Sequence, residues 1–150
     1  HPKYSPVFRY AQYIIDGTNH WLTGYCDWNI VLDSIGGPNH VNNFAGAQVM
    51  IDYQNDIIYY TPYYYVLKQF SRSMRPGDVA LQVEYPATMK TGADCETQDI
   101  FLCAVEKTDG SYAINILNMG EDTTMPVQLG SHYAMVNLPS ASIQTIIVRL

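Results

Sequence analysis

The sequence predicts a chain in two parts, a helix-strand-loop-helix portion of an α/β barrel over residues 1–78 and an antiparallel β-sandwich over residues 79–150. The first observation is the spacing of apolar residues, which changes near Val79 from the 3.6-residue period of helices to the two-residue period of strands. The second is the order of elements before this change, because helices and strands that alternate along the chain build α/β folds. The third is the series of short apolar segments after it, which is typical of a sandwich.

The first expected element is a helix over about residues 6–22. Ser5 is a suitable N-cap residue, and Pro6 occupies the first helical position, where its missing backbone N–H costs nothing. Apolar residues at helical spacing follow as far as Trp21. We therefore expect a packed helix, with Trp21 buried between it and the barrel.

The second expected element is a strand over residues 25–32. This run is apolar on both sides of the pleat, as parallel strands covered on both faces are. It is followed by Gly36-Gly37-Pro38-Asn39, a turn that begins a surface loop. We expect a binding site at this strand end, because Trp28 supplies a flat apolar face, and carboxamides such as Asn29 and Asn43 supply neutral donors and acceptors. These groups suit a sugar.

Residues 49–60 predict a hairpin of two short strands joined by the polar turn Gln54-Asn55-Asp56. Thr61-Pro62 then begins a second helix that runs to about Met74. Beyond it, Thr108-Asp109-Gly110 predicts a tight hairpin turn. The strands expected in this second part cover residues 79–85, 99–106, 111–118, 124–129 and 143–149.

Composition excludes several classes of function. The formal net charge is −6 and the eight Lys and Arg residues are scattered, so the chain lacks the basic surface that nucleic-acid binding needs. No apolar run approaches the ~20 residues of a membrane-spanning helix, and the N-terminal residues have no signal-peptide core. Thirteen tyrosines and a charged fraction of only 15% fit carbohydrate contact or a buried interface.

No metal site or cofactor is predicted. The four histidines lack ligand spacing, and three cysteines are too few for a disulfide framework. Cys26 lies in the expected strand and should be a small buried hydrophobic residue. A bridge between Cys95 and Cys103 stays open, and an exported protein would favour it.

The block from residue 24 to residue 44 has an order of residues with no generic structural reason to recur. It reads Asp-Trp-Asn, an aliphatic run, Gly-Gly-Pro-Asn and then Asn-Phe. This order closely resembles the last barrel strand and following loop of glycoside hydrolase family 30, the glucosylceramidase and β-1,6-glucanase group. The resemblance is strong over about residues 4–80 and general over residues 81–150. It implies the last units of a (β/α)8 TIM barrel followed by a β-sandwich, with further sandwich strands supplied by a segment before the barrel.

The resemblance also implies a function, retaining hydrolysis of β-glucosides or β-glucans through two carboxyl groups. The family carries these glutamates on barrel strands upstream of the Asp-Trp-Asn strand. We therefore expect this chain to supply substrate-binding residues but neither the nucleophile nor the acid/base. Its partners would be the carbohydrate and the N-terminal barrel segment, and the protein would be secreted, extracellular or periplasmic.

Three residues take expected roles from the resemblance. Trp28 matches the tryptophan that forms the floor of the sugar site, and Asn43 matches the asparagine that points into the pocket from the loop. His40 stands where many relatives have tryptophan, so the outer subsite should differ. The segment Ala45-Gly46-Ala47-Gln48 departs from the Cys-Asp-Ala-Pro-like run of glucosylceramidases, which argues against a lipid-linked substrate.

Other polar residues of the block allow two interpretations. Asp27 and Asp33 are the only carboxylates expected near the site, but Asp27 could instead hydrogen-bond a neighbouring barrel strand and Asp33 could open the turn. Asn29 and Asn39 fit structural roles better than ligand contact. A second hypothesis for the whole chain also stays open, a carbohydrate-binding or interaction module without catalysis. The chain alone lacks the expected nucleophile and acid/base and is therefore predicted to be inactive.

Overall fold

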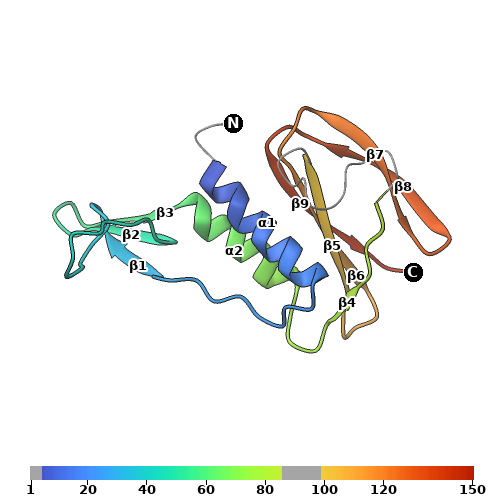
Figure 1. Cartoon of the computed structure of the whole chain (residues 1–150), viewed down its shortest axis with the longest axis horizontal. Coiled ribbons are helices and arrows are strands. Elements are labelled where there is room, and N and C mark those ends of the chain that lie inside the picture. The colour runs from blue at the N-terminus through green and yellow to red at the C-terminus, as the bar shows by residue number, and fades with distance from the viewer. Residues whose placement is uncertain (1–4, 86–98) are drawn as a thin grey trace.

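The computed structural model describes residues 5–85 and 99–150. Figure 1 shows three blocks in a row, a small sheet at one end, two helices in the middle and a larger group of strands at the other end. Within the described residues, neither helix is long and apolar enough to cross a membrane. In chain order the elements are α1 (Ser5–Asn19), β1 (Val31–Asp33), β2 (Val49–Asp52), β3 (Ile57–Tyr60), α2 (Pro62–Ser73), β4 (Val79–Leu81), β5 (Ile100–Glu106), β6 (Tyr112–Asn118), β7 (Thr123–Leu129), β8 (His132–Leu138) and β9 (Ser142–Val148).

The described strands form three sheets. In the first, β1 runs parallel to β2, and β2 pairs with β3 as a hairpin. The second is antiparallel and has the order β4-β5-β6-β9. The third is the hairpin β7–β8, which packs against one face of the four-stranded sheet. An α/β part therefore precedes an antiparallel part of two packed layers, as the sequence predicts.

Helix α1 ends earlier than predicted. The chain leaves the helix after Asn19, where the N–H of Leu22 donates to the carbonyl of Gly17 over 2.8 Å. Trp21 lies in this turn with φ 68° and is 83% exposed, so the prediction that it packs the helix to the barrel is wrong. The reason is that a left-handed residue after the helix end no longer lies on the apolar face of the helix.

The strand predicted over residues 25–32 is also wrong in extent, because β1 covers only Val31–Asp33. Among the described residues β1 has β2 as its one neighbour, and the residues before it have no strand to pair with. Cys26 is consequently exposed and not the buried residue that the sequence predicts. The possible bridge from Cys95 lies outside the described residues, whereas Cys103 is fully buried and burial raises the pKa of its thiol to about 12.

The hairpin and second helix are confirmed. β2 and β3 flank the predicted turn, where Asp52 Oδ1 accepts from the backbone N–H groups of Gln54 and Asn55. Helix α2 begins at Pro62, but the Thr61 hydroxyl makes no cap bond and donates instead to the Ala47 carbonyl over 2.7 Å. The start of α2 is thereby tied to the start of β2.

The second part contains the predicted strands, with two differences. β4 covers only Val79–Leu81 of the expected 79–85, and β8 at His132–Leu138 is not predicted at all. Most residues of β8 are exposed on both sides, so the strand lacks the alternation of apolar and polar residues that sequence prediction needs. The turn between β5 and β6 is confirmed, with Gly110 at φ 79°.

The four-stranded sheet has a core on each face. Toward the helices, Phe101, Cys103 and Leu117 pack with residues of α1 and α2 such as Ile15 and Phe70. On the opposite face lie Ala104, Ile114, Ile116 and Leu138, together with partly buried residues of the β7–β8 hairpin. The four-stranded sheet therefore lies between the helix pair of the first part and the β7–β8 hairpin (Figure 1).

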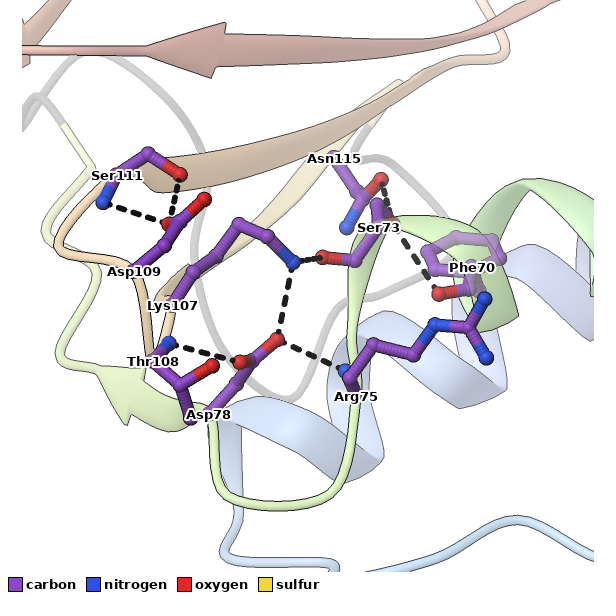
Figure 2. A network of polar contacts seen from close by, with 9 residues as sticks. All are labelled: Phe70, Ser73, Arg75, Asp78, Lys107, Thr108, Asp109, Ser111 and Asn115. Carbon is purple, nitrogen blue, oxygen red and sulfur yellow. Dashed lines mark hydrogen bonds and ion pairs between the residues drawn. The ribbon is translucent and has the colours of Figure 1, made fainter.

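Polar contacts join α2 to this sheet. Asn115 is fully buried, and its Oδ1 accepts from the hydroxyls of Ser73 at 2.9 Å and Thr145 at 2.7 Å. Figure 2 shows the continuation of these contacts, where the Lys107 ammonium lies between the Ser73 carbonyl and the Asp78 carboxylate, at 3.1 and 3.2 Å. Buried polar groups need partners, so these contacts fix how α2 sits on the sheet.

Asp78 stands at the predicted boundary between residues 1–78 and 79–150. Burial alone would raise the pKa of its carboxyl, but the backbone N–H groups of Arg75 and Thr108 and the Lys107 ammonium lower it by more. The helices and the sheet share one core across this point. The boundary itself stays a prediction.

We expect Asp78→Asn to lower the free energy of unfolding by about 2 kcal/mol near neutral pH, because it leaves the largely buried Lys107 ammonium without its counter-charge. Since the folded-state pKa of Asp78 is lowered, its contribution is present above the unfolded value of about 3.9 and is lost as the pH falls through the folded value. Denaturant melts at several pH values measure this. The exposed control Glu84→Gln should change little, and an Asp78→Asn penalty that persists at low pH would contradict the argument.

Candidate functional site

The predicted site lies at the small sheet, in the loop of residues 34–47 that joins the parallel strands β1 and β2. The loop has a narrow neck, where the Ala45 N–H donates to the Gly36 carbonyl over 3.1 Å. Gly36 has φ 89°, and a Cβ there would lie 2.5 Å from the Ala45 carbonyl oxygen. Only glycine fits this position, so the Gly-Gly-Pro-Asn motif has a structural cause at its first residue.

Two side chains order the loop from within. Asp33 Oδ1 accepts from the N–H groups of Ile35 at 3.1 Å and Gly37 at 2.7 Å. Asn39 Oδ1 accepts in the same way from Val41 at 3.1 Å and Asn43 at 2.9 Å. Both residues therefore serve the loop backbone, which is the structural role that the sequence allows for each.

The residues predicted to touch a ligand are mostly exposed. Trp28 is 86% exposed just before β1, while His40 and Asn43 are exposed in the loop. Asn29 is half-buried beside Trp28. The structure thus presents an indole and an ordered polar loop next to the same short strand, and no described contact tests their predicted roles.

Asp27 has a different environment, because its carboxylate is contacted from other parts of the chain. Gln48, the residue directly before β2, donates its Nε2 to Asp27 Oδ2, and the Tyr10 hydroxyl from α1 also hydrogen-bonds this carboxylate. The Tyr10 ring centroid lies 4.8 Å from that of Tyr63 and 6.3 Å from that of Tyr25. We call Tyr10, Tyr25 and Tyr63 the tyrosine cluster. Asp27 therefore contacts a helix and the residue before β2, in line with its structural interpretation.

Two phenols beside Asp27, those of Tyr10 and Tyr25, have raised pKa values. Burial, followed by the nearby Asp27 charge and its hydrogen bond, raises the pKa of Tyr10 to about 12. Burial and Asp27 also raise the pKa of Tyr25. A carboxylate is thus kept beside phenols that stay protonated and can donate to it.

Sequence reasoning missed Gln48, Tyr10 and Tyr63 as members of this site. Gln48 is a buried polar residue directly before the apolar run of β2, and that break in the pattern was the available signal. Tyr10 and Tyr63 had no signal, because their spacing fits the apolar faces of their helices equally well. Among the described residues, no group of three or more His, Cys, Asp or Glu side chains could hold a metal ion.

Comparison with protein families gives matches over most of the chain. Residues 3–74 match the glycosyl hydrolase family 30 TIM-barrel domain. Residues 89–146 match the glycosyl hydrolase family 30 beta sandwich domain. The two matches follow each other in the order that the fold shows.

Individual proteins show the same similarity. The lysosomal acid glucosylceramidase of Mus musculus is 31% identical over 116 residues, which are 76% of this chain and 20% of that protein. The crystal structure of SrfJ from Salmonella typhimurium aligns with a TM-score of 0.83 and 25% identity, over 96% of this chain and 30% of that one. The endo-beta1,6-glucanase BT3312 shares the fold, with a TM-score of 0.70 and 24% identity over 87% of this chain and 28% of that one. This chain spans about a fifth of the curated relative and under a third of each aligned structure.

We expect the Tyr10 phenol to titrate near pH 12 and Asp27→Asn to lower this pKa only in part, because burial, its largest cause, remains. Since the folded-state pKa is raised, the stability that it contributes is present below the unfolded value of about 10 and is lost as the pH rises through the folded value. Phenolate absorbance, taken as the difference from a Tyr10→Phe variant, measures the titration. If the Asp27→Asn variant gave the same titration curve, the Asp27 carboxylate would have no effect on the pKa of Tyr10.

Proposed function

Because the chain belongs to glycosyl hydrolase family 30, we propose that it is part of a retaining β-glycosidase acting on β-glucosides or β-glucans. The chain spans only a fraction of its relatives, so the activity is that of a longer parent protein. The observation that carries the proposal is the exposed Trp28 beside an internally ordered loop with Asn43 and His40. The parent protein is proposed to be secreted, as the resemblance implies.

In this proposal Trp28 stacks on the apolar C–H face of a sugar ring, as an exposed indole can. Asn43 offers its carboxamide to sugar hydroxyls, and the Asn39 contacts hold its backbone in place. His40 contacts the leaving-group side. The indole and the carboxamide are neutral, which fits an uncharged sugar.

The catalytic carboxyl groups are proposed to lie elsewhere in the parent protein. Retaining enzymes need two of them about 5 to 5.5 Å apart, one to attack the anomeric carbon and one to protonate the leaving oxygen. Asp27 is engaged by Gln48 and Tyr10, and Asp33 by two backbone N–H groups. Neither is free for that chemistry, which supports a role for this chain as a wall of the substrate site.

The exposed surface of the small sheet supports a position inside a larger barrel. Ile30 is 73% exposed, Ile35 71%, Phe44 56% and Ile58 59%. Of these residues Ile58 lies in β3 and the other three lie just before β1 or in the loop after it, and so many exposed apolar side chains suit a surface that further structure covers. The N-terminal barrel segment of the parent protein is the proposed cover.

We expect that glutamine in place of Glu84, Glu106 or Glu121 leaves kcat/KM of the parent protein within about threefold, because none of them acts on the substrate. Hydrolysis of an aryl β-glucoside measures this. The isolated chain should show no turnover above buffer. Turnover by the isolated chain that Asp27→Asn or Asp33→Asn abolishes would overturn the assignment of the carboxyl groups.

We expect Trp28→Ala to lower kcat/KM of the parent protein at least about tenfold, because the stacking face is lost in both ground and transition states. Trp21→Ala is the matched control, since Trp21 is equally exposed but lies at the end of α1. In both variants the free energy of unfolding should stay within about 1 kcal/mol of that of the parent protein. Equal kinetic effects of the two substitutions would contradict the placement of the site.

A further inference from the structure

Gln48 is a buried amide with an incomplete set of hydrogen bonds. It is 7% exposed, its Nε2 donates to Asp27, and its Oε1 has no partner among the described residues. Leaving the buried Oε1 without a partner costs free energy. The side chain nevertheless keeps this orientation, because only its Nε2 can donate to the Asp27 carboxylate.

Asp27 depends on this donor, because its other described partners are also neutral. The Tyr10 hydroxyl reaches it from α1, Tyr25 lies on the same segment, and Tyr63 of α2 packs on Tyr10. The ion pair found in the described residues is elsewhere, between Lys107 and Asp78. A partly buried carboxylate with no cation among the described residues relies on the neutral donors around it.

Gln48 itself is firmly held. The N–H of Thr61 donates to its carbonyl over 3.0 Å, and the Thr61 hydroxyl bonds the carbonyls of Ala47 and Gln48. Gly46 approaches Tyr63 so closely that a Cβ would lie 3.3 Å from the ring. The start of β2 is therefore a fixed point between the two helices and the small sheet.

The chain around Trp28 is tied to this fixed point at two places. Asp27 is bound by the Gln48 side chain, and the Ile30 carbonyl accepts from the N–H of Val49 at 3.0 Å. Trp28 and Asn29 lie between the two ties. The residues between α1 and β1 have no regular secondary structure, so these two contacts set the position of the exposed Trp28 indole.

We propose that Gln48 is a positioning residue, which holds the indole of Trp28 for a sugar through its bond to Asp27. The sugar contact rests on the proposed function, whereas the ordering of Trp28 does not.

The test uses the chain with Trp21→Phe, in which Trp28 is the one remaining tryptophan. Gln48→Leu, which has similar volume and no donor, should lower the steady-state fluorescence anisotropy of Trp28. Gln54→Leu is the matched control, because Gln54 lies exposed in the β2–β3 turn, and it should change nothing. Unchanged anisotropy in Gln48→Leu, or equal changes in both variants, overturns the proposal.

Gln48→Glu provides a second test, which can still be carried out if the leucine variant fails to fold. At about pH 5 a glutamate here can share a proton with Asp27 and keep the tie, while at about pH 8 the two carboxylates repel each other. The facing phenols of Tyr10 and Tyr25 have raised pKa values and stay protonated over this range. Anisotropy should match the Gln48 protein at the lower pH and fall at the higher pH, and a pH-independent result overturns the proposal.

In the parent protein, Gln48→Leu should lower kcat/KM for an aryl β-glucoside about tenfold, as misplacement of a substrate contact does. The kcat/KM of the Gln48→Glu variant, divided by that of the protein with Gln48, should rise as the pH is lowered. A parent protein that hydrolyses no β-glucoside would count against the proposed function, and the anisotropy of Trp28 would still decide the role of Gln48.

Discussion

Burial of the α1–α2 pair on one face of the four-stranded sheet is the constraint on which the rest of the structure depends. Ile15 and Phe70 pack against Phe101 and Leu117 in one core that no single element could form. Apolar packing alone would tolerate small shifts of the helices along the sheet. The buried contacts of Asn115 remove that freedom, because a shift would leave its Oδ1 without the two hydroxyl donors. The positions of both helices are thus fixed, and with them the positions of Tyr10 and Tyr63 of the tyrosine cluster.

The small sheet and its loop lie on the other side of the helices from the four-stranded sheet (Figure 1). The position of the site therefore depends on the position of the helices. Its loop has no regular structure, so its backbone N–H groups are satisfied one by one by Asp33 and Asn39. These contacts shape the loop but do not place it on the protein. Placement comes from Thr61 and from Asp27, which bind the start of β2 and the segment before β1 to the two helices. Local hydrogen bonds and long-range ties therefore have separate tasks.

The sequence predicted the features that short-range chemistry decides. Pro62 at a helix start and Gly110 in a turn act through their own backbone preferences, and both elements are found where expected. The strand at 25–32 and the burial of Trp21 were wrong, because each requires neighbours that periodicity cannot specify. Gln48 was missed for the same reason, since its partner Asp27 is brought near only by the parallel pairing of β1 and β2.

The charge pattern of the site narrows the kind of ligand that it suits. Asp27 is held by an amide and a phenol, so its negative charge is not cancelled, and the chain has a net charge of −6. An acidic sugar near Trp28 would be repelled by this uncompensated charge, and the repulsion grows as water leaves the site. A neutral hexose meets no such cost and gains the indole face. The electrostatics of the site are thus consistent with an uncharged sugar, the class to which the β-glucoside proposed as substrate belongs.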